Sequence, residues 1–220
     1  MERQNKLKDS LLTFLHNLFD LMIINWLFFL CSLPVITVGI AACGAYRVTL
    51  KLARGEAVSP AKDFFRGCRE NLLPGFLLGL AALILAVVAA GDIWFALAQA
   101  GFLRNLYLII GVIISVIFLI VVSYTFALQA MFRNPLKTQI ANAFKLAVVA
   151  PGKTLLLWLI LLIPVLFALV LPPVAVGMLG FLYLVVGFSG PMYGASYILR
   201  DVFDRVNGSP VVEQPPLSDN

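Results

Sequence analysis

The chain offers few side chains that could carry chemistry. His16 is the one histidine of the 220 residues, and Asp20 follows it four positions later, so a helix would place both on one face. Asn25 lies further along the same apolar segment. An imidazole and a carboxylate inside a membrane segment could carry a proton or bind a polar solute. His16 and Asp20 both lie in the first turns of this segment, near the membrane surface. A structural hydrogen-bonded pair is therefore the competing interpretation.

A second polar group lies near the end of the chain. The run 189–197 contains Tyr193, Ser196 and Tyr197, and Pro191 within it should kink a helix. Such a run could line a cavity, meet another subunit or simply pack in the bundle. Together the two segments give a candidate polar path or interface formed by His16, Asp20, Asn25, Tyr193, Ser196 and Tyr197.

Known catalytic patterns are missing from the sequence. It contains no HExxH and no GxSxG motif. The run 152–154 ends like a phosphate-binding loop, but that motif needs a glycine where Ala147 stands. Cys31, Cys43 and Cys68 have no metal-binding spacing. The sequence therefore predicts no catalytic residue, no metal site and no cofactor, and a protein that is not an enzyme.

The composition indicates a membrane protein. Apolar residues make up 61% of the chain and charged residues 12%, with a mean hydropathy of +0.98. A soluble domain has about 45–50% apolar and about 25% charged residues. These values exclude an ordinary soluble enzyme, a disordered chain and a secreted disulfide scaffold. The net charge is +5, but the basic residues flank apolar blocks, which indicates membrane orientation and a lipid partner rather than nucleic acid.

The apolar blocks predict an all-α polytopic bundle of about six transmembrane elements. The first block, residues 11–46, would form a straight helix of about 54 Å, too long for a hydrocarbon core of about 30 Å. A hairpin turn at 33–39, with Pro34 and Gly39, resolves this conflict. The predicted elements lie at 11–33, 36–53, 72–91, 106–132, 154–171 and 174–199, with a turn at Pro172–Pro173.

The element at 36–53 is the short one, and two interpretations of it stay open. It is either a short span whose Arg47 and Lys51 extend towards the membrane surface, or a re-entrant helix buried in protein. The other five elements are long enough for full spans.

The distribution of Lys and Arg predicts the orientation, because positive residues stay in the cytoplasm. With six crossings and a cytoplasmic N-terminus, the inner segments hold all of the 16 Lys and Arg residues except Arg104. Both termini are then cytoplasmic. We expect residues 1–200 to form a single transmembrane domain and residues 201–220 a cytoplasmic tail.

Small residues at spacing four mark two faces for close helix packing. Gly75 and Gly79 form one GxxxG pair, and Gly190 and Gly194 form another. Glycines let helix backbones touch inside lipid, where hydrophobic drive between helices is small. Contact within the chain and contact with a partner are both compatible with these patterns.

The chain resembles the YesL family of bacterial integral membrane proteins. The resemblance rests on the run Leu33-Pro34-Val35-Ile36-Thr37-Val38-Gly39, on the small-residue helix Ala41–Tyr46, on the basic segment after it, on the entry Asn71–Gly79 and on Asp92. Such proteins are often encoded beside components of carbohydrate ABC importers in Gram-positive bacteria.

That resemblance implies a multi-pass protein of the bacterial cytoplasmic membrane with a role in carbohydrate uptake. The expected function is that of a non-enzymatic accessory or assembly component, with importer permease or ATPase subunits as partners. The alternative is a self-contained transporter of a small neutral solute, favoured by the broken first hairpin and by the kink at Pro191.

Overall fold

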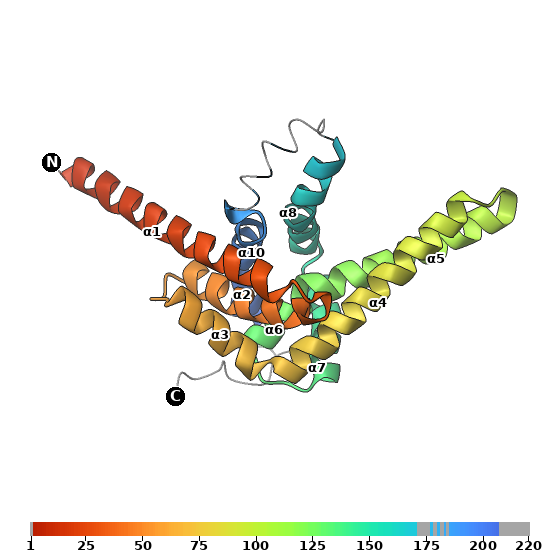
Figure 1. Cartoon of the computed structure of the whole chain (residues 1–220), viewed down its shortest axis with the longest axis horizontal. Coiled ribbons are helices and arrows are strands. Elements are labelled where there is room, and N and C mark those ends of the chain that lie inside the picture. The colour runs from red at the N-terminus through yellow and green to blue at the C-terminus, as the bar shows by residue number, and fades with distance from the viewer. Residues whose placement is uncertain (1, 171–176, 178–179, 181–182, 184, 207–220) are drawn as a thin grey trace.

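A computed structural model of the chain describes residues 2–170, 177, 180, 183 and 185–206. The fold is all-α, as predicted, and Figure 1 shows its arrangement. The helices are α1 (Glu2–Cys31), α2 (Val38–Ala53), α3 (Pro60–Glu70), α4 (Leu72–Leu97), α5 (Gly101–Ile120), α6 (Phe126–Met131), α7 (Leu136–Val149), α8 (Pro151–Val170) and α10 (Ser189–Val206); a 3-10 turn (Val35–Thr37) precedes α2, and a π-helical segment (Val121–Thr125) joins α5 to α6.

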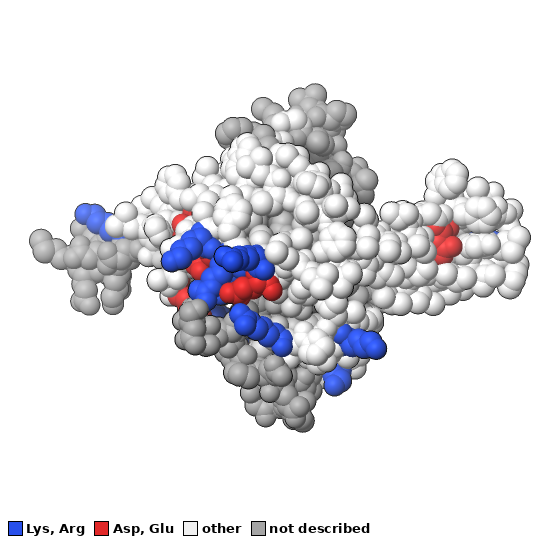
Figure 2. Space-filling model, turned by 60° about the horizontal axis from the view of Figure 1, so that its bottom comes forward, with Lys and Arg blue, Asp and Glu red and all other residues white. Residues whose placement is uncertain are grey.

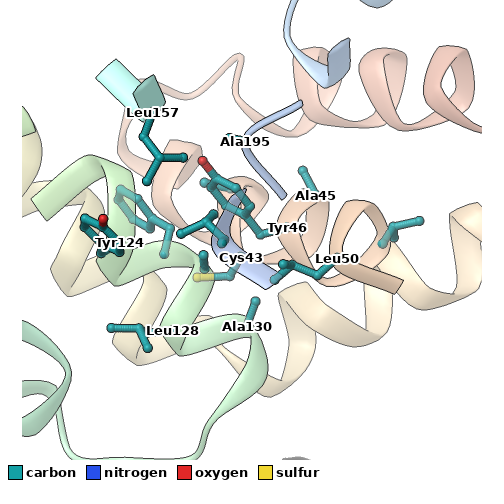
Figure 3. Close-up of a cluster of buried hydrophobic side chains, with 14 of the residues drawn as sticks. Cys43, Ala45, Tyr46, Leu50, Tyr124, Leu128, Ala130, Leu157 and Ala195 are labelled. Carbon is teal, nitrogen blue, oxygen red and sulfur yellow. The ribbon is translucent and has the colours of Figure 1, made fainter. Parts of the chain in front are cut away.

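Helix α2 is the centre of the molecule. It contacts α1, α3, α4, α6 and α10, and most of its residues are buried. Its sequence explains this position, because glycine, alanine and cysteine occupy residue 39 and residues 41–45 and let neighbouring helices approach closely. Figure 3 shows Cys43, Tyr46 and Leu50 of this helix among side chains from the helices around it.

Proline and glycine set the helix boundaries around α2. Pro34 precedes the 3-10 turn that leads into α2. Gly55, with φ of 72°, follows the last turn of α2 in the left-handed conformation that glycine adopts without strain. Pro60 occupies the first position of α3, where its missing N–H is not needed.

Within the described residues, four helical segments are long and apolar enough to cross a membrane, and a fifth qualifies if the bent pair α7–α8 counts as one span. The four segments are Leu11–Cys31, Val35–Ala53, Leu72–Leu97 and Gly101–Met131. In the bent pair, α7 and α8 meet at 108°. These helices indicate a multi-pass membrane protein. Of the sixth predicted element, 174–199, the structure describes residues 177, 180, 183 and 185–199, and its second half belongs to α10. The turn at Pro172–Pro173 lies outside the described residues.

Two parts of the chain extend away from the body in opposite directions. One is the N-terminal half of α1, and the other is the hairpin of α4 and α5 (Figure 1). The turn of this hairpin is Ala98–Ala100, followed by Gly101 with φ of 68°. The turn is shorter than the gap between the predicted elements 72–91 and 106–132, because Asp92 and Arg104 both lie within helices.

Helix α10 continues into the segment predicted as a tail. It runs through Val206, and Val202 and Phe203 are buried in the core. Asp204 pairs with Arg54 at 3.4 Å, and Asp201 pairs with Lys153 at 3.0 Å. The beginning of the predicted tail is therefore attached to the body by burial and charge, and residues 207–220 lie outside the described part.

Candidate functional site

The densest group of polar contacts surrounds Glu70, the last residue of α3. Arg47 of α2 donates to its carboxylate at 2.7 Å, and Arg66 donates to the other oxygen at 3.0 Å. Arg133, in the loop after α6, lies 3.8 Å away. The Arg47 side chain is only 5% exposed. A buried guanidinium needs such a counter-charge, because an isolated ion is costly to remove from water.

A second charge pair lies one turn further along α2. Lys51 approaches the carboxylate of Asp63 at 3.4 Å, and the other Asp63 oxygen accepts the Ser59 N–H at 3.0 Å. Asp63 thus holds the start of α3 and a basic residue of α2 at once. Figure 2 shows positive and negative side chains gathered together on this face of the molecule. The glutamate and aspartate pairs fix α3 against α2.

Neutral polar side chains connect the junction of α3 and α4 to α6. Gln129 donates to the side-chain oxygen of Asn71 at 3.0 Å, and Asn71 donates to the Gly67 carbonyl at 2.9 Å. Gln139 of α7 donates to the Phe132 carbonyl at 2.8 Å, just past the end of α6. All three side chains are buried, so these bonds fix four helices relative to one another.

His16 and Asp20 lie one turn apart near the middle of α1. Their closest side-chain atoms are 3.8 Å apart, and the histidine side chain is 77% exposed while that of the aspartate is 7% exposed. The adjacent Asn17 donates to the Tyr193 hydroxyl at 3.4 Å. Tyr193 and Tyr197 share a 2.6 Å hydrogen bond, one turn apart on α10. The tyrosines thus lie where α10 meets α1.

Asn25 connects α1 to the beginning of α10. Its side-chain oxygen accepts the N–H groups of Phe188 and Ser189 at 2.9 and 3.2 Å, and its amide donates to the Tyr183 carbonyl at 3.2 Å. The side chain is buried. Asn25 therefore satisfies the free N–H groups at a helix start, as an N-cap residue does within its own helix.

Ser196 is buried between α10 and α2. Its hydroxyl donates to the Met192 carbonyl at 2.8 Å and shares a 2.9 Å hydrogen bond with the Thr49 hydroxyl. The six candidate path residues thus belong to several separate contacts between α1, α2 and α10. Each of the three most buried among them, Asp20, Asn25 and Ser196, has different neighbours.

Gly75 and Gly79 of α4 meet Gly39 at the start of α2. A side-chain carbon added at Gly39 would lie 2.6 Å from the Gly79 Cα and closer still to the Gly75 carbonyl oxygen. One added at Gly79 would lie 2.8 Å from the Gly39 nitrogen. The hairpin-turn glycine and the GxxxG pair therefore form one backbone contact inside the chain, which leaves that face of α4 closed to a partner.

The second glycine pair has looser surroundings. A carbon added at Gly190 would meet only Val186 at 3.9 Å among the described atoms, and one added at Gly194 would meet Ile160 of α8 at 3.5 Å. Both are ordinary van der Waals distances. Gly194 faces α8, whereas no helix backbone approaches Gly190 within the described part of the chain.

Asp92 is the acidic residue of the projecting α4–α5 hairpin. Its Cβ faces Gly111 of α5, and its Oδ2 atom is buried without a hydrogen-bond partner among the described residues. Gly111 is the one buried residue assigned to α5. Figure 2 shows acidic side-chain atoms on this hairpin, apart from the other charged groups. An unpaired carboxylate oxygen on an otherwise apolar hairpin is costly, so it needs a partner.

A cavity of about 280 Å³ lies between α2, α4 and the helices around them. Its walls are Phe28, Val38, Ala42, Tyr46, Gly79, Ala82, Leu83, Ala86, Phe118, Val122, Phe126, Leu161 and Met192. Within this lining the Tyr46 hydroxyl is the one polar side-chain group. Among the described residues, no group of three or more His, Cys, Asp or Glu side chains could hold a metal ion.

Sequence reasoning did not identify Arg47 and Glu70 as partners. One of the two interpretations of residues 36–53 extended Arg47 and Lys51 towards the membrane surface, whereas the structure buries Arg47 in protein and pairs both residues with acids of α3. The available signal was the spacing of Arg66 and Glu70, four residues apart after a helix-starting Pro60. That spacing predicts a short charged helix beside α2 but does not say which face contacts it.

Comparison with known proteins gives one similarity. Residues 21–93 match the family model described as "Protein of unknown function, DUF624". No curated protein and no solved structure matches the chain. The matched segment runs from α1 through Ile93 of α4, so it contains the Gly39–Gly75–Gly79 contact, the Arg47–Glu70 pair and Asp92. Over these residues the chain is similar to the DUF624 family.

Proposed function

We propose that this protein is a non-enzymatic accessory component of a carbohydrate ABC importer in the bacterial cytoplasmic membrane. The observation that carries the proposal is the α4–α5 hairpin, which extends from the body with its sides uncovered in the described structure (Figure 1). The partners we expect are permease or ATPase subunits of the importer.

The hairpin has the properties of a surface for another membrane helix. Val112 and Ile113 of α5 are more than half exposed. Asp92 keeps a buried oxygen without a partner in the described chain, and a basic or hydrogen-bonding side chain of a neighbouring protein would satisfy it. The GxxxG pair of α4 packs inside the chain instead, so we assign the partner surface to the distal half of the hairpin.

The link to carbohydrate uptake comes from resemblance. The YesL family is a DUF624 family, and the chain is similar to DUF624 proteins over residues 21–93. YesL proteins are often encoded beside carbohydrate ABC importers. This association supports an importer as the partner, and the exposed hairpin supports a binding role.

A self-contained transporter of a small neutral solute is the alternative. A second cavity of about 220 Å³ favours it, because Asn25 is one of its lining residues. The rest of that lining is Trp26, Phe29, Gly180, Tyr183 and Phe188. The Asn25 side chain already binds the start of α10, and the larger cavity is apolar. Both observations favour the accessory role over a sugar path.

The test is a mild-detergent pull-down of the tagged protein from its native membrane, with quantitative mass spectrometry. We expect an importer permease or ATPase at near-stoichiometric yield. Val112→Trp, on the exposed hairpin, should reduce that yield at least fivefold, and Asp92→Asn should reduce it as well. Leu159→Trp is the matched control, because Leu159 is equally exposed on α8.

The proposal fails if the wild-type chain purifies alone or only with copies of itself. It also fails in its surface assignment if Leu159→Trp removes the partner and Val112→Trp does not. Recovery of a lone protein would direct attention to solute flux across reconstituted vesicles, with Asn25→Ala as the first variant.

A further inference from the structure

The cavity beside Tyr46 is built for a ligand that is not a sugar. At about 280 Å³ it is roughly twice the size of an engineered cavity of about 150 Å³ that stays dry and binds benzene. Its walls are aliphatic, aromatic and backbone groups, so they offer no set of hydrogen bonds to hydroxyl groups. A polar solute would lose its hydration there without compensation.

Small residues of α4 create the space. Gly79, Ala82 and Ala86 lie on the face of α4 that borders the cavity. Larger side chains form the opposite walls, from Phe118 of α5 to Met192 of α10. Both of these are partly exposed, as expected at the rim of a cavity that opens between helices. Inside a bilayer, the molecules at such a rim are lipid chains.

Tyr46 adds one specific polar group to this apolar wall. The residue is 2% exposed and lines the cavity, and among the described residues no hydrogen bond involves its hydroxyl. Figure 3 shows its oxygen directed towards the side where Leu157 and Ala195 lie. A tyrosine hydroxyl can donate one hydrogen bond, so this phenol is available to a ligand in the cavity that carries a hydrogen-bond acceptor.

We infer that the cavity binds a single lipid chain that carries one oxygen acceptor, with the oxygen at Tyr46. The side chains that line an empty cavity lose van der Waals contacts on the side that faces it, and a hydrocarbon chain in the cavity restores those contacts. The phenol donates to the oxygen of an alcohol, an acid or an ester, and this bond selects an oxygenated chain over a plain alkane. The inference does not depend on the accessory role, because the cavity and the exposed hairpin lie on different parts of α4.

The experiment uses the full-length protein in phosphatidylcholine vesicles and a dodecanol derivative with a diazirine at its far end as photoprobe. Labelled residues are mapped by mass spectrometry as a function of probe content. We expect saturable labelling of cavity residues such as Leu83 and Met192. Unlabelled dodecanol should compete about three- to tenfold better than dodecane, as one neutral hydrogen bond allows.

Three variants make the test specific. Ala86→Trp fills the cavity and should reduce saturable labelling at least tenfold. Ala81→Trp, on the exposed side of the same helix, is the matched control and should leave it unchanged. Tyr46→Phe should keep the labelling but remove the preference for dodecanol over dodecane.

Three results would contradict the inference. Labelling that rises linearly with probe content in the wild type would show contact with bulk lipid only. Equal labelling in Ala86→Trp and Ala81→Trp would show that the probe lies outside the cavity. If dodecane competes as well as dodecanol in the wild type, the role assigned to Tyr46 is wrong.

Discussion

Glu70 illustrates how one side chain holds several elements together. Its carboxylate accepts hydrogen bonds from Arg47 of α2 and Arg66 of α3, and Arg133 of the loop after α6 lies within ion-pair distance. The pair with Arg47 is largely buried. Breaking a buried pair by removing one partner costs more than the pair itself contributes, because the remaining ion is left without compensation.

The first prediction follows from this pair. Glu70→Gln keeps the shape of the side chain but removes the carboxylate charge that pairs with Arg47. We expect a loss of about 3 kcal/mol in stability, at the low end for a buried pair because Glu70 stays partly exposed. This corresponds to a fall of roughly 6–12 °C in Tm for a chain of this length. The change in Tm is measured as the heat-induced loss of the monomer peak in size-exclusion chromatography.

Glu56 gives the control for that measurement. It is exposed and lies in the turn between α2 and α3, so Glu56→Gln removes the same charge without breaking a buried pair. Its Tm should stay within about 1–2 °C of the wild type, as for ordinary surface changes. Equal effects of the two substitutions would mean that the Arg47–Glu70 bond does not hold α2 and α3 together.

Cys68 carries the second prediction at this scale. The thiol lies beside Gly44 of α2, with its sulfur 3.6 Å from the Ile40 carbonyl oxygen. Burial raises the pKa of the Cys68 thiol to about 12, because the thiolate is poorly solvated there. Since only the thiolate reacts with maleimides, its reaction should be slow at neutral pH and accelerate about tenfold per pH unit up to pH 10.

The measurement uses a variant with Cys31→Ser and Cys43→Ser, so that Cys68 is the one thiol left. A cysteine placed at exposed Ala57 in a background without other cysteines serves as the comparison. Its rate should level off near the ordinary cysteine pKa of about 8.5. A Cys68 rate that levels off at the same pH would show that the thiol is not shielded between α2 and α3.

At the scale of elements, the contact between α2 and α4 depends on glycine. Gly39→Ala would place a carbon 2.6 Å from the Gly79 Cα, against backbone that cannot turn aside. We expect a loss of about 1–3 kcal/mol or more, the usual cost of an overpacked contact, together with a lower yield of folded protein. The thermal assay used for Glu70 measures it.

Gly91 makes a direct comparison, because a carbon added there meets nothing within 4 Å. Gly91→Ala should be neutral or slightly stabilising, since alanine has the higher helix propensity. A destabilising Gly91→Ala together with a neutral Gly39→Ala would contradict the close approach of α2 and α4.

The same contact shows what the sequence could and could not predict. The all-α class follows from the apolar blocks, and the hairpin turn at Pro34 follows from their length. The spacing of Gly75 and Gly79 predicts a close approach but not that Gly39 fills it. The position of α2 was the hardest to derive, because residues 36–53 fit a short span and a protein-buried helix equally well until their neighbours are known.

The partner of Arg47 could not be predicted for a related reason, and the first of the two interpretations of residues 36–53 shows why. Arg47 is close to an apolar block in the sequence, and near a membrane this position suggests a side chain that reaches for the lipid headgroups. The structure instead provides Glu70 from a helix 23 residues away. Periodicity along one segment cannot reveal a partner on another, so the Arg47–Glu70 pair and the polar contacts of Gln129 become visible only once the helices are packed.

At the scale of the whole molecule, the distribution of basic residues predicts the orientation in the membrane. The turn after α2 and the segment of α7 lie among basic residues, whereas the hairpin turn Ala98–Ala100 has Arg104 as its nearest basic residue. Because basic loops are retained in the cytoplasm, we expect Ala98 and the turn at Val35 to face outwards and Ala57 to face the cytoplasm.

Cysteine accessibility in intact cells tests this orientation. In a background without native cysteines, Val35→Cys, Ala57→Cys and Ala98→Cys each expose a single thiol, since all three positions are exposed. A membrane-impermeant maleimide should label the cysteines at 35 and 98, and it should label the one at 57 only after permeabilisation. If intact cells label the cysteine at position 98 but not the one at position 35, then Val35–Ala53 does not cross the membrane. In that case α2 would be a re-entrant helix held inside the bundle by the Gly39 and Arg47 contacts, and the N-terminus would have to lie outside for α4 and α5 to keep their orientation.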